Sequence, residues 1–212
     1  MSFHSSIAVI GGTGKSGKYL VRHLLSRGFF IRMLLRNGSQ SSIESSQLKL
    51  IRGDARDPKA VQELLDGAQA VISTLGQPKG EAPIFSDATR NVIDALHFLK
   101  ISRYILTTGI SVDTPLDLKK GYTAAATEWM KLNYPDTTID KQREWELLQG
   151  SNLDWTLVRL PLIELTEEKK EIKLSLADCP GEKISAASLA TFLVNQLLDE
   201  TYIRQAPFLF NE

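Results

Sequence analysis

The chain has 212 residues, of which 42% are hydrophobic, with 25 Lys and Arg balanced by 25 Asp and Glu. These values exclude disordered and fibrous proteins, and the zero net charge gives no general attraction for nucleic acid or for an anionic membrane. Cys179 is the single cysteine, the spacings of zinc ligands are missing, and no apolar run is long enough to span a bilayer; we therefore expect a cytoplasmic protein without a disulfide, a metal site or a membrane segment.

Strand-like and helix-like segments alternate along most of the chain. Short β-branched runs predict strands, and apolar residues at helical spacing predict helices, one of which begins at the capping pair Asp57-Pro58. This alternation predicts a Rossmann-type α/β fold, with a doubly wound parallel sheet and helices on both faces, in a single domain of residues 1–212. We expect strands at 6–10, 29–35, 48–51, 70–74, 104–107 and 155–159, and helices at 15–27, 57–67, 85–100, 136–150 and 185–198.

A glycine-rich loop joins the first expected strand to the first expected helix. Gly11, Gly14 and Gly17 stand at three-residue intervals, which favours a tight turn, close approach of a pyrophosphate and close helix packing. Free N–H groups at the helix start attract phosphate, and the helix dipole adds about 0.3–2 kcal/mol. A turn without a ligand is the alternative. The loop predicts a dinucleotide site that includes Gly11, Thr13, Gly14, Lys15, Ser16 and Gly17.

The end of the second strand indicates which dinucleotide is favoured. In NAD-specific domains an acidic residue at this place binds the ribose hydroxyls, but here Arg36 follows the strand and the next acidic residue is Glu44. Arg36 offers a planar fork to a 2′-phosphate, and such a charge-assisted bond is worth about 1.5–3 kcal/mol. Arg32 either assists or faces solvent, and an ordinary surface arginine is the alternative for Arg36. We expect NADP(H) to be favoured over NAD(H).

Several further segments carry a family resemblance. The glycine loop, Arg36 and residues 53–57, 88–93 and 153–159 together resemble the atypical short-chain dehydrogenase/reductase superfamily, and the NmrA-like and biliverdin reductase B (flavin reductase) members look most similar. The resemblance implies that Asp54, with Ala55, binds the adenine, whereas a turn or capping carboxylate is the alternative. It also implies that the ribose and the nicotinamide lie along the end of the fourth and fifth strands, at Thr74, Leu75, Gly76 and Thr107.

The resemblance also names catalytic candidates, but one expected group is missing. Thr108 and Ser111 stand where the family often carries a catalytic serine or threonine. The usual pair is a tyrosine with a lysine four residues later, and no tyrosine of this chain has a lysine at that spacing. Lys141 stands in the expected helix, where it binds ribose hydroxyls, supplies a proton or is simply solvated, while Thr137 occupies the tyrosine's position. A threonine hydroxyl is too weak an acid to replace that tyrosine.

These features lead to three functional hypotheses. The first is an NADPH-dependent oxidoreductase that passes hydride to a small or planar acceptor, such as a flavin or a quinone, in a shallow pocket whose acceptor side is completed by residues 161–212. The second is a non-catalytic NADP(H)-binding redox sensor of NmrA-like type, which the missing tyrosine favours. An NAD(P)-dependent epimerase or isomerase ranks last, because it usually needs that tyrosine. We expect a monomer or a small homo-oligomer that binds a small-molecule acceptor and no nucleic acid or membrane.

Overall fold

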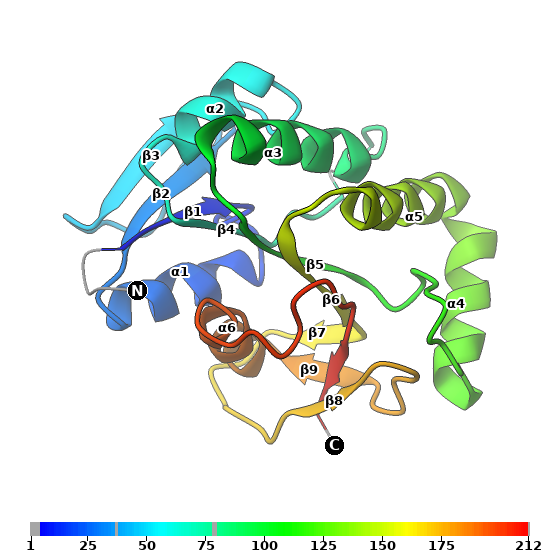
Figure 1. Ribbon diagram of the computed structural model, residues 1–212. Coiled ribbons are helices and arrows are strands. Elements are labelled where there is room, and N and C mark those ends of the chain that lie inside the picture. The colour runs from blue at the N-terminus through cyan, green and yellow to red at the C-terminus, as the bar shows by residue number, and fades with distance from the viewer. Residues whose placement is uncertain (1–4, 37, 78–79, 212) are drawn as a thin grey trace.

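A mostly parallel sheet forms the centre of the protein (Figure 1). The computed structural model describes residues 5–36, 38–77 and 80–211. In these residues the sheet has eight strands in the order β3-β2-β1-β4-β5-β6-β10-β8. Their bounds are β1 (Ser6–Ile10), β2 (Phe30–Leu35), β3 (Leu48–Arg52), β4 (Ala70–Ser73), β5 (Arg103–Gly109), β6 (Asp154–Leu160), β8 (Lys173–Ser175) and β10 (Phe208–Phe210).

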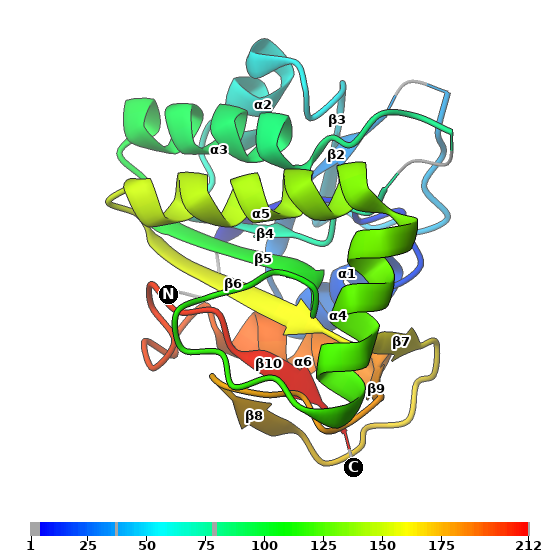
Figure 2. The ribbon, with the colours of Figure 1, turned by 90° about the vertical axis from the view of Figure 1, so that its right-hand side faces the viewer.

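Helices cover both faces of this sheet (Figure 2). One face carries α1 (Gly17–Ser26) and α6 (Ala186–Asn195), and the other carries α2 (Pro58–Leu65), α3 (Phe85–Leu99) and α5 (Pro135–Gly150). The predicted Rossmann-type α/β fold is confirmed. Among the described residues, no helix has both the length and the apolar character needed to cross a membrane.

The sequence did not predict every element. Helix α4 (Gly121–Asn133) buries only Thr123 and Thr127, and leaves Trp129 and Leu132 exposed, so it lacks the apolar stripe from which helices are recognised. β8 pairs antiparallel with β10, which corrects the expectation of a wholly parallel sheet. A separate two-stranded sheet, also not predicted, contains β7 (Leu162–Glu164) and β9 (Lys183–Ser185).

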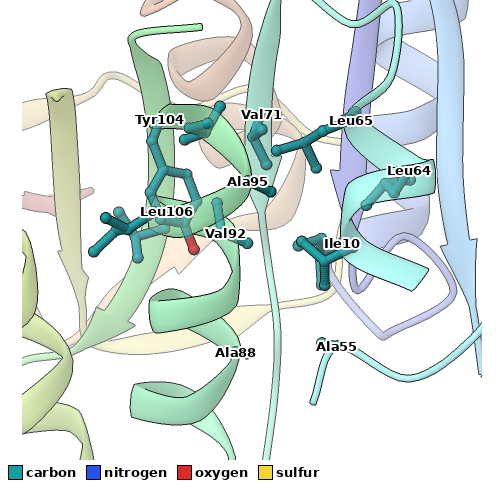
Figure 3. Close-up of a cluster of buried hydrophobic side chains, with 14 of the residues drawn as sticks. Ile10, Ala55, Leu64, Leu65, Val71, Ala88, Val92, Ala95, Tyr104 and Leu106 are labelled. Carbon is teal, nitrogen blue, oxygen red and sulfur yellow. The ribbon is translucent and has the colours of Figure 1, made fainter. Parts of the chain in front are cut away.

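Strand β1 is buried on both faces, because its side chains alternate between two apolar layers. Ile7 and Val9 point into the layer beneath α1 and α6. Ala8 and Ile10 point into the layer beneath α2 and α3, where Ile10 lies in the same cluster as Val71 and Leu106 (Figure 3). The two layers fix the position of β1, and therefore the place at which the glycine loop emerges from the sheet.

Arg159 connects the last part of the chain to this sheet. Its guanidinium is fully buried, lies 3.5 Å from the centre of the Phe208 ring and pairs with Asp117 at 2.6 Å. It also donates hydrogen bonds to the carbonyl oxygens of Ala206 and Val112, at 2.8 and 3.2 Å, and to that of Leu176 at 3.1 Å. Phe208 of β10 lies opposite Arg159 of β6 in the sheet. Through these bonds, the Arg159 side chain holds the loops that contain Val112, Leu176 and Ala206 against the far edge of the sheet.

Candidate nucleotide-binding site

A hollow of about 540 Å³ opens where the strand order reverses, between β1 and β4. The chain leaves β1 for α1 on one face and leaves β4 for α3 on the other, so the two connections diverge and leave a crevice. The hollow is lined by Ile10, Gly11, Thr13, Gly14, Lys15, Ser16, Leu34, Arg36, Ser39, Gly53, Asp54, Ala55, Thr74, Leu75, Gly76, Gln77 and Ile84. All the predicted cofactor residues except Gly17 and Thr107 are therefore brought together.

The glycine loop presents a helix start to the hollow. Gly11 adopts a φ of +79°, which a residue with a side chain rarely takes, and the amide of Gly14 donates to the carbonyl oxygen of Gly11 at 2.9 Å. Ser16 caps α1 without a side-chain hydrogen bond, while the amides of Lys18 and Tyr19 donate to the backbone carbonyl oxygens of Gly14 and Ser16. The positive end of the helix dipole at this N-terminus is suited to bind a diphosphate.

Gly17 and Thr107 do not line the hollow. Gly17 is buried beneath the loop, and a Cβ there would overlap the carbonyl oxygen of Gly11. Its role is to let the first turn of α1 pack against the loop. The Thr107 hydroxyl donates to the carbonyl oxygen of Ser73 at 3.5 Å, which ties β5 to β4. Close packing of the helix is the role that the glycine spacing predicts for Gly17, and the place of Thr107 beside the nicotinamide stays a prediction.

Charged side chains lie at the end of the hollow where the strands β2 and β3 finish. Arg36 and Asp54 line it, and Arg56 holds Asp54 through two bonds of 2.9 and 2.8 Å. The hydrogen bonds from Arg56 keep the pKa of Asp54 below its ordinary value, so Asp54 is an anionic acceptor. Glu81, which the sequence did not single out, pairs with Arg36 at 2.6 Å. Arg32 lies elsewhere, because it donates to carbonyl oxygens at the end of α2.

The three predicted catalytic residues lie around the end of β5. Thr108 and Ser111 are buried, and neither hydroxyl oxygen has a hydrogen-bond partner in the described part of the chain. A Cβ built on Gly109 would lie 3.5 Å from Lys141 Nζ and 3.6 Å from Ser111 Oγ. The amine and the hydroxyl therefore converge on Gly109. Buried hydroxyls without a partner are uncommon, and none of the three predicted catalytic residues lines the hollow.

Lys141 is not the solvated helix lysine that the sequence allowed as an alternative. It is partly buried, with Nζ 4.8 Å from the centre of the Phe85 ring, and burial lowers its pKa. One turn later on α5, burial raises the pKa of Glu144 to about 7. Glu144 accepts a bond of 2.9 Å from Thr89, whose hydroxyl lies 3.2 Å from the Tyr104 hydroxyl.

The polar groups of Lys141, Glu144, Thr89 and Tyr104 form a buried cluster, which extends from Lys141 into the layer between α3 and α5. Sequence reasoning missed Glu144, Thr89 and Tyr104, which come from three different elements. The only signal available was the spacing of Lys141 and Glu144, three residues apart on one helix face. The structure thus adds a titratable group next to the lysine at the end of β5.

Comparison with known proteins identifies the family. A family model described as NAD(P)H-binding matches residues 11–200. The chain belongs to this NAD(P)H-binding family. The match begins at the glycine loop and covers every residue that lines the hollow except Ile10, so the hollow is the natural place for the nucleotide of an NAD(P)H-binding protein.

Solved structures share the fold over nearly the whole chain. A short-chain dehydrogenase/reductase from Veillonella parvula in complex with NADP has a TM-score of 0.79 at 19% identity, covering 98% of this chain and 95% of the other. ChuY, an anaerobillin reductase from Escherichia coli O157:H7, has a TM-score of 0.79 at 20% identity, covering 98% and 97%. The resemblance to the short-chain dehydrogenase/reductase superfamily is confirmed at the level of the fold.

Two of the curated relatives are much longer than this chain. The photosystem II assembly factor Ycf39 of Cyanophora paradoxa is 32% identical over 105 residues, which are 47% of this chain and 33% of that protein. The chloroplastic protein TIC 62 of Arabidopsis thaliana is 27% identical over 180 residues, which are 72% of this chain and 26% of that protein. The matched parts are a third or less of the length of these two relatives.

Proposed function

We propose that this NAD(P)H-binding protein is an NADPH-dependent oxidoreductase that reduces a small or planar acceptor, such as a flavin or a quinone. The observation that carries the cofactor preference is Arg36, which lines the hollow at the end of β2, where NAD-specific domains have an acidic residue. The NADP complex of the Veillonella parvula neighbour and the reductase activity in the name of ChuY support the same assignment.

The residues of the hollow fit a dinucleotide from end to end. The α1 start would bind the diphosphate, Arg36 the 2′-phosphate, and Asp54 the adenine. Leu75 and Gly76 would direct the nicotinamide towards Gly109, where Thr108, Ser111 and Lys141 lie. Bound NADPH would supply the hydride, and the proton would come from water or from Lys141. Residues 161–212 would complete the acceptor side of the site. That the protein is a monomer or a small homo-oligomer in the cytoplasm stays a prediction.

A redox sensor is the second candidate. Thr137 of α5 stands four residues before Lys141, where a catalytic tyrosine would be. Without that acid, reduction of a simple carbonyl would lack its proton donor, whereas a flavin or quinone can take its proton from water. Steady NADPH oxidation with a panel of flavins and quinones supports the enzyme. Tight NADPH binding without turnover across the panel supports the sensor.

The cofactor preference is tested by fluorescence titration of NADPH and NADH. We expect the wild type to bind NADPH more tightly, and Arg36→Ala to reduce this preference at least tenfold, because a charge-assisted bond is worth about 1.5–3 kcal/mol. Arg90→Ala is the matched control, since Arg90 is an exposed arginine on α3 that does not line the hollow. Equal wild-type affinities for the two nucleotides would overturn the assignment of NADPH.

A further inference from the structure

The carboxylate of Glu81 lies between two arginines, of which Arg36 lines the hollow. One carboxylate oxygen is 2.6 Å from Arg36 Nη1, and the other is 3.3 Å from Arg56 Nη2. Arg36 follows β2, Arg56 follows β3 and Glu81 follows β4, so three separate strand ends bring these charges together. Two guanidinium groups that bind one carboxylate form a site for a single anion with several oxygens.

This anion site coincides with the place expected for the 2′-phosphate. Arg36 lines the hollow beside Asp54, which would bind the adenine, and Asp54 fixes Arg56 through its paired bonds. Arg56 therefore keeps its position whether or not Glu81 is bound to it. We propose that Arg56 joins Arg36 in binding the 2′-phosphate of NADP(H), and that Glu81 occupies the phosphate's place in the free protein and so limits the preference for NADPH over NADH.

Charge and exposure support this exchange. The side chains of Arg36, Arg56 and Glu81 are 52%, 41% and 35% exposed, so Glu81 can turn towards solvent without disturbing the core. A phosphate monoester carries roughly −1.5 to −2 charges at neutral pH, against −1 for a carboxylate, so it binds the two arginines more strongly. NADH has a hydroxyl at this position, and brings no charge with which to displace Glu81.

With NADH bound, Glu81 would have a second use. The chain has no acidic residue at the end of β2, but Glu81 reaches the same place from the segment that follows β4. Its carboxylate can accept a hydrogen bond from the ribose hydroxyl, which is the role of the acidic residue in NAD-specific domains. The inference rests on the proposed function, because it explains the preference for NADPH over NADH by two opposing contributions. Arg36 and Arg56 strengthen the binding of NADPH, and Glu81 competes with its 2′-phosphate.

The test isolates the phosphate by comparing 2′,5′-ADP with 5′-ADP in calorimetric titrations of the full chain. In Glu81→Gln we expect 2′,5′-ADP to bind about three- to fivefold more tightly, since a surface ion pair is worth up to about 1 kcal/mol, and 5′-ADP to bind no more tightly. In Arg56→Gln, which can still donate to Asp54, we expect 2′,5′-ADP to bind about five- to tenfold more weakly, with 5′-ADP unchanged.

Glu128→Gln is the matched control, because it removes the same charge from an exposed site on α4. Equal tightening in Glu81→Gln and Glu128→Gln, or none in Glu81→Gln, would overturn the role of Glu81. Equal loss of both probes in Arg56→Gln would show that Arg56 acts only through Asp54 and the adenine, and would overturn its role. If the wild type binds NADPH but Glu81→Gln and Arg56→Gln do not show the expected changes in affinity, the proposed function stands and this inference falls. If the wild type binds neither NADPH nor NADH, the proposed function and the inference both fall.

Discussion

A Cβ atom on Gly11 would lie 2.6 Å from the backbone carbonyl oxygen of Thr74. The end of β1 and the end of β4 therefore approach each other so closely that a side chain has no room between them. The amide of Thr74 also donates to the carbonyl oxygen of Ile10 at 2.9 Å, which extends the pairing of the two strands. This contact forms the floor of the nucleotide hollow at the point where the strand order reverses.

Gly11→Ala should cost both stability and nucleotide binding. The new methyl group meets the Thr74 carbonyl and the residue must keep a positive φ, which alone costs about 1–2 kcal/mol. Gly67→Ala is the control, because Gly67 has a φ of +78° with nothing within 4 Å of its added Cβ. In urea denaturation we expect Gly11→Ala to lose more free energy of unfolding than Gly67→Ala, and NADPH titration to show weaker binding in Gly11→Ala alone. Equal losses of stability and unchanged binding would contradict the contact.

The glycine loop shows what could be predicted from the sequence. The turn, the helix start and the neighbouring strand ends depend on residues close together along the chain, so Gly11, Gly14 and Ser16 were placed correctly in the hollow. Asp54 and Thr74 were predicted from the family resemblance instead, and the structure places both in the lining of the hollow. Local pattern was enough for the glycine loop, whereas these two residues depended on the resemblance.

The parts that could not be predicted depend on contacts between distant segments. Glu81 reaches Arg36 across 45 positions, and Thr89 reaches Glu144 across 55. Nothing in the local sequence marks either pairing. Helix α4 was missed for another reason, since its exposed Trp129 and Leu132 remove the usual apolar pattern.

Arg159→Met should destabilise the fold strongly. The substitution removes the buried guanidinium from Asp117, which keeps its bonds with Thr114 and Lys119, and leaves the carbonyl oxygen of Ala206 without this donor. Breaking a buried ion pair from one side costs about 3–5 kcal/mol. The control is Arg90→Met, whose pair with Asp87 is 55% and 61% exposed and is worth at most about 1 kcal/mol. Thermal and urea unfolding of the two variants gives the comparison. A loss in Arg159→Met no larger than in Arg90→Met would show that the guanidinium does not anchor the three loops.

The stability contributed by Glu144 should fall as the pH rises. Burial raises its pKa in the folded protein from an ordinary value of 4.5 to about 7. Between these values the folded state holds a proton that the unfolded state has released, so the free energy of unfolding decreases with pH across this window.

Glu144→Gln should remove this pH dependence. The variant stays neutral, so relative to the wild type its free energy of unfolding should rise by about 1–3 kcal/mol between pH 4.5 and pH 7. Glu146→Gln, on the exposed side of the same helix, should follow the wild type. Urea denaturation at a series of pH values measures both. Parallel wild-type and Glu144→Gln curves over that window would mean that folding does not raise the pKa of Glu144.

Lys141→Met should separate catalysis from nucleotide binding. Lys141 Nζ lies beside Gly109 and outside the residues that line the hollow, so the Kd of NADPH should change less than about twofold, a few tenths of a kcal/mol. If the amine supplies or relays the proton, kcat with a competent flavin or quinone should fall about a hundredfold, as for other positioned acids. The control Arg143→Met removes an exposed cation from the same helix and should keep both constants.

The pH dependence of the fall in kcat distinguishes the possible sources of the proton. If Lys141 is the donor, wild-type kcat should fall at high pH, where the amine loses its proton, so the loss caused by Lys141→Met should become smaller there. If the proton comes from water alone, kcat should stay near the wild-type value and follow the same pH profile. A fall in NADPH affinity with kcat unchanged would instead place the amine on the ribose, because an interaction made equally before and during the chemical step changes binding but not kcat.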